Sequence, residues 1–184
     1  MLYKNIHFPF TKIFQKYTLD QTAKLNTELL YIREIKISED DSLTINKYLN
    51  ERGISDLLNI LSFKRKDPIA DYHKTHIDSS SLGIIHCSVV IPVSGCQHTE
   101  QFWYNGDYEI ITKTAPGSSA KYTGIRWKNI PEKIGSVEIN NNTTLVKTDI
   151  PHGVYSYKDE YRTTCTLRFV NNENFDYLAE RLSI

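Results

Sequence analysis

The pattern of hydrophobic and polar positions divides the chain into two parts. From about His73 to Phe169, short β-branched and aromatic runs alternate with turn residues, which is typical of an antiparallel sandwich or barrel. Asn105-Gly106 and Pro116-Gly117 lie between runs, where such residues favour tight turns. The runs predict strands at 84–93, 98–104, 108–114, 122–127, 136–139, 143–148 and 161–170.

Before residue 70 the pattern mixes helix and strand. Residues 20–31 carry apolar side chains among good helix formers and predict a helix, and residues 30–37 alternate enough to predict a strand. Ser38 opens a helix-start signal, and apolar residues follow at helical spacing until Gly53 ends the pattern. Residues 54–63 fit either a helix or a strand.

The length of 184 residues suits a single hydrophobic core. We expect residues 1–70 to form a support region of helices and strands and residues 71–170 to form a β core. Residues 171–184 are expected to add a C-terminal helix, because Phe175, Leu178 and Leu182 keep helical spacing. The fold class predicted is therefore mainly β with flanking N-terminal helices.

Charge narrows the choice of partner. The chain has 22 basic and 22 acidic residues, so no overall positive field attracts a phosphate backbone. We interpret the basic cluster at residues 64–66 as a solvated loop. These observations count against nucleic acid and favour a small molecule or a protein side chain as substrate.

Other sequence features bear on location and redox state. No apolar run approaches the ~20 residues that cross a bilayer, and the N-terminus lacks the apolar stretch of a secretion signal. We therefore expect a cytoplasmic protein without membrane contact. The three cysteines, Cys87, Cys96 and Cys165, are interpreted as small buried hydrophobic residues.

Two histidine motifs are candidates for chemistry. In His76-Ile77-Asp78, residues two apart on an extended segment point to the same side, so an imidazole and a carboxylate can reach one metal ion. The second motif places His152 directly after Pro151. The His-x-Asp match alone is weak because such a spacing also arises by chance, and a lone histidine such as His152 is more often structural than a ligand.

The strand 161–169 separates polar from apolar residues. Its alternation places Cys165, Leu167 and Phe169 on one face and a polar set on the other: Arg162, Thr164, Thr166 and Arg168. On a plain sandwich the polar face would look into solvent, whereas in a small barrel it would line the lumen. An arginine followed two residues later by a threonine suits a carboxylate, because the guanidinium is bidentate and the hydroxyl adds a third hydrogen bond.

The order and spacing of these residues resemble the Fe(II)/2-oxoglutarate-dependent dioxygenases. The resemblance rests on a His-x-Asp early in a run of short strands, a distal histidine, and an arginine ten residues beyond it followed by x-Thr. It covers residues 73–169, about half of the chain. It implies a double-stranded β-helix, or jelly roll, with N-terminal helices packed on one sheet.

The resemblance also implies roles for particular residues. His76, Asp78 and His152 would be the iron ligands, and Arg162 with Thr164 would bind the distal carboxylate of 2-oxoglutarate. The family implies no catalytic residue beyond the metal ligands. The expected reaction consumes O₂, releases succinate and CO₂, and oxidises a substrate, most simply by hydroxylation.

Several alternatives remain open from the sequence. Arg168 competes with Arg162 for the carboxylate, and a cupin-like metal site is conceivable from His98, Glu100 and His152. The run 102–104 is a candidate substrate wall. Further polar side chains suit the lumen or ordinary strand positions: Tyr72, His86, Ser88, Tyr122 and Arg126. The competing function is a non-catalytic jelly-roll or cupin-like binding module, because a fold does not determine function.

Overall fold

A computed structural model describes residues 1–23, 31–65, 72–80, 83–114, 121–158 and 160–183. Strands take up 45% of these residues and helices 22%, so the described part of the protein is mainly β, as predicted. The strands are β1 Tyr3–Asn5, β2 Tyr31–Glu34, β3 Leu57–Arg65, β4 Ser79–Ser80, β5 Gly83–Ile84, β6 Cys87–Ser94, β7 Thr99–Asn105, β8 Tyr108–Thr114, β9 Lys121–Trp127, β10 Glu132–Glu138, β11 Thr144–Lys147, β12 His152–Ser156 and β13 Arg162–Phe169. The helices are α1 Thr11–Thr22, α2 Glu39–Asn50 and α3 Phe175–Arg181, with a short 3-10 turn η1 at Tyr72–Lys74.

The larger sheet has six antiparallel strands in the order β1-β11-β6-β13-β3-β2. Strand β13 is central and pairs along its length with β3 on one side and β6 on the other. Leu167, for example, lies opposite Ile60 and Val89. All eight residues of β13 are buried, because neighbouring strands cover both edges and other layers cover both faces.

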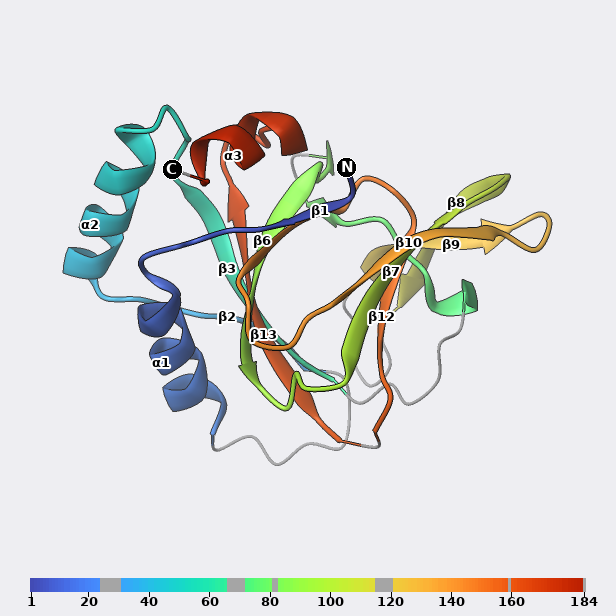
Figure 1. Ribbon diagram of the computed structural model, residues 1–184, viewed down its shortest axis with the longest axis horizontal. Coiled ribbons are helices and arrows are strands. Elements are labelled where there is room, and N and C mark those ends of the chain that lie inside the picture. Colours follow the sequence, from blue (N-terminus) through green and yellow to red (C-terminus); the bar gives the residue numbers. More distant parts are fainter. Residues whose placement is uncertain (24–30, 66–71, 81–82, 115–120, 159, 184) are drawn as a thin grey trace.

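The smaller sheet faces the larger one. Strands β10, β7 and β12 are antiparallel neighbours in that order. Single β-bridges from His76 to His152 and to Gly124 extend this layer to the β8–β9 hairpin. In Figure 1, β7, β10 and β12 lie opposite β6 and β13, and the hairpin extends away from the body.

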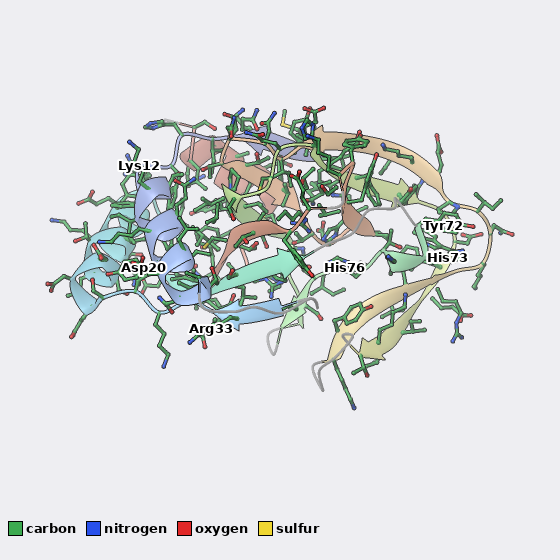
Figure 2. The ribbon with its side chains drawn as sticks, turned by 90° about the horizontal axis from the view of Figure 1, so that it is seen from below. Lys12, Asp20, Arg33, Tyr72, His73 and His76 are labelled. Atoms are coloured by element: carbon green, nitrogen blue, oxygen red, sulfur yellow. The ribbon has the colours of Figure 1, made fainter. Side chains whose placement is uncertain are left out.

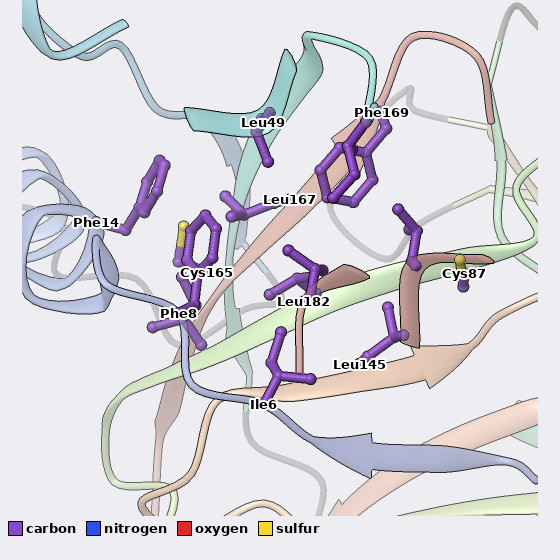
Figure 3. Packing of buried hydrophobic residues seen from close by; sticks show 14 of the residues in the cluster. Ile6, Phe8, Phe14, Leu49, Cys87, Leu145, Cys165, Leu167, Phe169 and Leu182 are labelled. Carbon is purple, nitrogen blue, oxygen red and sulfur yellow. The ribbon is translucent and has the colours of Figure 1, made fainter. Parts of the chain in front are cut away.

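The main hydrophobic core lies on the outer face of the larger sheet. Figure 1 shows the helices on this side, and Figure 3 shows their side chains meeting those of the strands. Phe14 of α1, Leu49 of α2 and Leu178 of α3 belong to one buried cluster with Cys165 and Leu167. The three cysteines are buried and free, as expected.

A second, smaller cluster lies elsewhere, between the two sheets. It consists of Val90, Trp103, Ile139 and Val146, with three partly buried neighbours. Few apolar residues therefore join the two sheets directly, and polar side chains occupy much of the remaining space between them.

Several predicted elements are confirmed. Helix α2 begins after Ser38, whose side chain accepts a hydrogen bond from the Asp41 N–H. Helix α3 begins after Asn174, which caps it in the same way through the Tyr177 N–H. Strand β8 has the predicted bounds, and the ambiguous stretch 54–63 contains most of strand β3. No helix in the described part of the chain is long and apolar enough to cross a membrane.

Helix α1, Thr11–Thr22, was not predicted from the sequence. It overlaps the predicted helix 20–31 at residues 20–22, whereas residue 31 begins β2 and residues 24–30 lie outside the described residues. The buried positions of α1 are Phe14, Thr18 and Thr22. Two of these three are threonines, so the buried face lacks the apolar period by which a helix is recognised.

The support region expected at residues 1–70 is not separate from the β core. Strands β1, β2 and β3 belong to the larger sheet, and β3 pairs with nearly all of β13. The basic cluster at 64–66 is also not simply a loop, because Lys64 and Arg65 end β3, while Lys66 lies outside the described residues. A long strand pairing therefore crosses the expected boundary at residue 70.

We predict that Leu167→Ala lowers the free energy of unfolding by about 2 to 5 kcal/mol, because it leaves a cavity at a fully buried position of the central strand. Urea denaturation measures this loss. Ile110→Ala is the control, since Ile110 is 55% exposed on β8 and its truncation should change stability by less than about 0.5 kcal/mol. Equal losses in the two variants would contradict the central place of β13.

Candidate metal centre

Backbone pairing brings the two histidines of the sequence motifs together. The His76 N–H donates to the His152 carbonyl at 2.9 Å, and the His152 N–H donates back to the His76 carbonyl at 3.0 Å. Directly paired residues in an antiparallel bridge project to the same face. Accordingly, the two imidazole centroids are only 4.5 Å apart.

Asp78 completes a group of three. Its Oδ1 lies 3.4 Å from His76 Nε2 and 3.7 Å from His152 Nε2, and the three ligand atoms lie within 4.8 Å of one another. Adjacent ligands on an octahedral ion with bonds near 2.1 Å are about 3 Å apart. A small movement of these side chains would therefore suit a divalent transition metal held by two imidazoles and one carboxylate.

The tautomer of His152 follows from its surroundings. Its Nδ1 lies 2.9 Å from the carbonyl oxygen of Ile150, which can only accept a hydrogen bond. The Nδ1–H therefore donates to that carbonyl, and the lone pair is on Nε2, the atom that faces Asp78. This orientation is the one that metal ligation requires.

Arg168 holds the carboxylate of Asp78. Its guanidinium donates to Oδ2 at 2.7 Å, and both side chains are largely buried. Burial alone would raise the pKa of Asp78, but the Arg168 guanidinium and a hydrogen bond from His76 outweigh burial and hold that pKa well below its usual value. Asp78 is thus an anion whose second oxygen, Oδ1, faces His76 and His152.

The electrostatics of His152 favour the neutral ring. Burial and the neighbouring His76 lower its pKa to about 4, against the opposing influence of Asp78. A neutral imidazole is the form that binds a metal. In the described part of the chain, His76, Asp78 and His152 are the only group of three such side chains close enough to share an ion.

A cavity of about 70 Å³ opens between the sheets at this group. One water needs about 10 to 15 Å³, so the space holds several waters or a small ligand. Its lining combines the three candidate ligands with polar and apolar side chains from both sheets: Phe63, Ser88, Val90, Gln101, Ile139, Val146, Thr148, Val154, Arg162, Thr164 and Thr166.

The polar face predicted for strand 161–169 is confirmed to point inward. Arg162, Thr164 and Thr166 line the cavity, while Cys165 and Leu167 face the helices. Arg162 is 5% exposed and Thr164 is 2% exposed. The structure therefore brings all five site residues expected from the sequence to one cavity.

Two sequence alternatives are not supported by the geometry. The cupin-like set fails because Glu100 lies on the opposite face of the small sheet from His152, where it accepts hydrogen bonds from Tyr155 at 2.6 Å and from Tyr157. Burial tends to raise the pKa of Glu100, but hydrogen bonds from these phenols, Ser136 and Lys133 lower it to about 2. Arg168 is committed to Asp78, which removes it as the first choice for a co-substrate carboxylate.

The aromatic run 102–104 does not form a single wall. Trp103 is fully buried between the sheets, and it is bonded through Nε1 to the Lys147 carbonyl at 2.8 Å. Phe102 and Tyr104 point to the other face of the strand, where their rings are 5.3 Å apart. Strand alternation therefore divides the run between two faces.

The other polar side chains suggested for the lumen lie in different surroundings. Ser88 lines the cavity, but His86 pairs with Asp149 through atoms 3.0 Å apart, and the exposed Arg126 lies 3.6 Å from Glu109. Tyr72 packs against His73, and the Tyr122 ring lies 6.1 Å from that of His76. Figure 2 shows His76 near the middle of the molecule and Tyr72 and His73 toward the hairpin side.

The β8–β9 hairpin borders the candidate metal centre. Gly124 of β9 is bridged to His76, and a Cβ there would meet the Lys113 side chain at 2.4 Å. Lys113 instead crosses this glycine and donates to the His73 carbonyl at 2.8 Å. The Lys113 hydrogen bond and the Gly124 bridge therefore hold the β8–β9 hairpin next to the His76 segment.

Sequence reasoning missed Gln101, Thr148 and the partner of Arg168. Gln101 stands in the run Thr99–Asn105, and its polarity among aromatic neighbours was a weak signal. Arg168 and Asp78 are 90 positions apart, so only the fold brings them together.

A scan of protein-family models and a search of curated proteins found no match to this chain.

We predict that Arg168→Met lowers the free energy of unfolding of the metal-free protein by about 3 to 5 kcal/mol, because it leaves the Asp78 carboxylate buried without its cation. Adding Asp78→Asn to this variant should recover much of the loss. Arg126→Met is the matched control, since its exposed pair with Glu109 should contribute less than about 1 kcal/mol. Chemical denaturation measures all three, and an additive double variant would contradict the pairing.

We also predict that the metal-free protein loses stability as the pH falls from about 6.5 to about 4. The unfolded chain protonates a histidine near pH 6.5, whereas the folded protein resists protonating His152 until about pH 4. The unfolded state therefore binds more protons in this window, which gives a slope of at most about 1.4 kcal/mol per pH unit. His152→Gln should flatten the slope in denaturation curves, whereas the exposed His7, as His7→Gln, should leave it unchanged.

Proposed function

We propose that this protein is an Fe(II)- and 2-oxoglutarate-dependent dioxygenase, an oxidoreductase built on a double-stranded β-helix. The observation that carries the proposal is one cavity with His76, Asp78 and His152 at one place and Arg162 with Thr164 on its wall. Each of these residues was expected from its spacing in the sequence. Their meeting is a geometric result that spacing alone does not require.

The strand pairings support the jelly-roll part of this proposal. A jelly roll has eight strands divided between two facing sheets. Two sets of four neighbours fit this description: β3-β13-β6-β11 in the larger sheet, and the His76 segment, β12, β7 and β10 in the smaller layer. The β8–β9 hairpin is then an insertion between β7 and β10.

The donor set fits Fe(II). Two histidines and one carboxylate on one face of the ion leave three positions open, enough for a bidentate 2-oxo acid and dioxygen. When bound, the ion would supply the activation of O₂ that is coupled to decarboxylation of 2-oxoglutarate to succinate and CO₂. Arg168 keeps Asp78 anionic and turned toward the ion by holding Oδ2.

Arg162 and Thr164 would hold the distal carboxylate of 2-oxoglutarate. A guanidinium offers two parallel hydrogen bonds to a carboxylate, and a buried charged hydrogen bond is stronger than a neutral one. Phe63, Val90 and Val154 supply apolar walls for the two methylene groups between the carboxylates. Asp78 is the single acidic residue among the described lining residues, so the cavity suits an anion.

The substrate side of the site is the β8–β9 hairpin. Tyr122 and Gly124 share the face of His76, because the bridge pairs Gly124 directly with that histidine. A substrate C–H placed near the ion would therefore lie against this hairpin. A small molecule or a protein side chain remains the proposed substrate class, since the net charge is zero.

We predict that anaerobic addition of Fe(II) and 2-oxoglutarate gives a weak visible charge-transfer band, because the 2-oxo acid chelates the ion. His76→Ala should abolish the band and weaken metal binding, whereas Arg162→Met should retain metal binding but require about 10- to 100-fold more 2-oxoglutarate. His7→Ala, at an exposed histidine, is the control and should behave as the wild type.

Absorption spectroscopy and equilibrium dialysis of the metal check these outcomes, and succinate formation checks turnover. A wild-type protein that binds the ion but gives no band and no succinate would contradict the oxygenase. That result would favour the competing function, a binding module that retains the scaffold without the reaction.

A further inference from the structure

Two buried polar side chains, one from each sheet, line the cavity with an atom that lacks a hydrogen-bond partner in the described part of the chain. Ser88 on β6 is fully buried and Gln101 on β7 is 3% exposed, and both line the cavity. Ser88 Oγ and Gln101 Nε2 have no hydrogen-bond partner among the residues that the structure describes. Buried donors are almost always satisfied in folded proteins, and these two line a cavity, so they are suited to hold a bound polar group.

Their positions lie along the path from the metal ligands to Arg162. Gln101 pairs with Val154, two residues beyond His152, on the side where β12 leads toward the start of β13. Ser88 lies on the inner face of the larger sheet, at the end away from Arg162. Its neighbour Val89 pairs with Leu167, which places Ser88 beside Arg168 and thus near Asp78.

The chemistry of both groups suits carboxylate oxygens. A carboxamide N–H and a hydroxyl each donate a hydrogen bond, as do the guanidinium and hydroxyl of Arg162 and Thr164. An elongated ligand with oxygen acceptors at both ends and an apolar middle would satisfy all of them. A 2-oxo dicarboxylate has this form.

We propose that Gln101 and Ser88 complete the co-substrate site, which rests on the proposed oxygenase function. Gln101 Nε2 donates to the distal carboxylate together with Arg162 and Thr164. Ser88 Oγ donates to the carboxylate at the metal end. Gln101 is therefore a specificity-determining residue that selects a dicarboxylic over a monocarboxylic 2-oxo acid.

The test is calorimetric binding of two ligands to the Mn(II)-loaded protein, which does not depend on turnover. The ligands are 2-oxoglutarate and 2-oxopentanoate, which has the same chain length but no distal carboxylate. Gln101→Leu should weaken binding of 2-oxoglutarate at least about tenfold and change that of 2-oxopentanoate less than about twofold. Ser88→Ala should weaken both ligands by a similar factor, about three- to tenfold.

Two matched controls remove equally buried hydroxyls outside the cavity. Thr99 lies on the same strand as Gln101, and Ser62 lies on β3 opposite Cys165, on the face toward the helices. Both are fully buried with an oxygen that lacks a partner in the described residues. Thr99→Val and Ser62→Ala should leave both affinities within about twofold of the wild type.

The melting temperature of the ligand-free protein distinguishes a ligand-binding role of Gln101 from a structural one. Gln101→Leu removes an atom without a partner, so its melting temperature should equal or exceed that of the wild type. If Gln101→Leu does not fold, Gln101→Glu is measured instead. The glutamate keeps the shape of the glutamine and places its own carboxylate against the distal carboxylate of 2-oxoglutarate. It should weaken 2-oxoglutarate at least about a hundredfold and spare 2-oxopentanoate.

The outcomes are distinguishable from those of the proposed function. An unchanged preference between the two ligands in the Gln101 variants, with tight 2-oxoglutarate binding by the wild type, overturns the role of Gln101 and leaves the oxygenase standing. Equal losses in Thr99→Val overturn it as well. A wild-type protein that binds neither 2-oxo acid overturns the proposed function together with this inference.

Discussion

A strand has two faces, and β13 must bury both of them. It is the central strand of the larger sheet, and all eight of its residues are buried. One face meets the helices with Cys165 and Leu167, and the other points between the sheets with arginines and threonines. Burying so many polar groups is unfavourable unless each finds a partner, so the rest of the interior is arranged around this demand.

The two arginines of β13 have different surroundings in the interior. At one end of β13, Arg168 is neutralised by Asp78, which in turn lies against the two histidines. At the other end, Arg162 lies at a cavity whose described lining contains no further acid. The same strand thus carries a cation that orients a metal ligand and, six residues earlier, a cation suited to an anionic ligand.

Period-two reasoning predicted the parts of the site that lie on single strands. It grouped His76 with Asp78 and separated the two faces of β13, because alternation is a local property of extended chain. It could not predict contacts between distant segments, such as Arg168 with Asp78. It also did not predict most of α1, whose buried face includes Thr18 and Thr22, or β12, in which glycine interrupts the β-branched pattern.

The pairing of His76 with His152 joins segments more than seventy positions apart through a single bridge. An ion shared by Asp78 and His152 would act there as a cross-link, and the loop it closes is long enough for closure to reduce the entropy of the unfolded chain substantially. The chain has no disulfide among its three free cysteines to do the same. Its lifetime as a folded protein would therefore rise and fall with the free metal concentration around it.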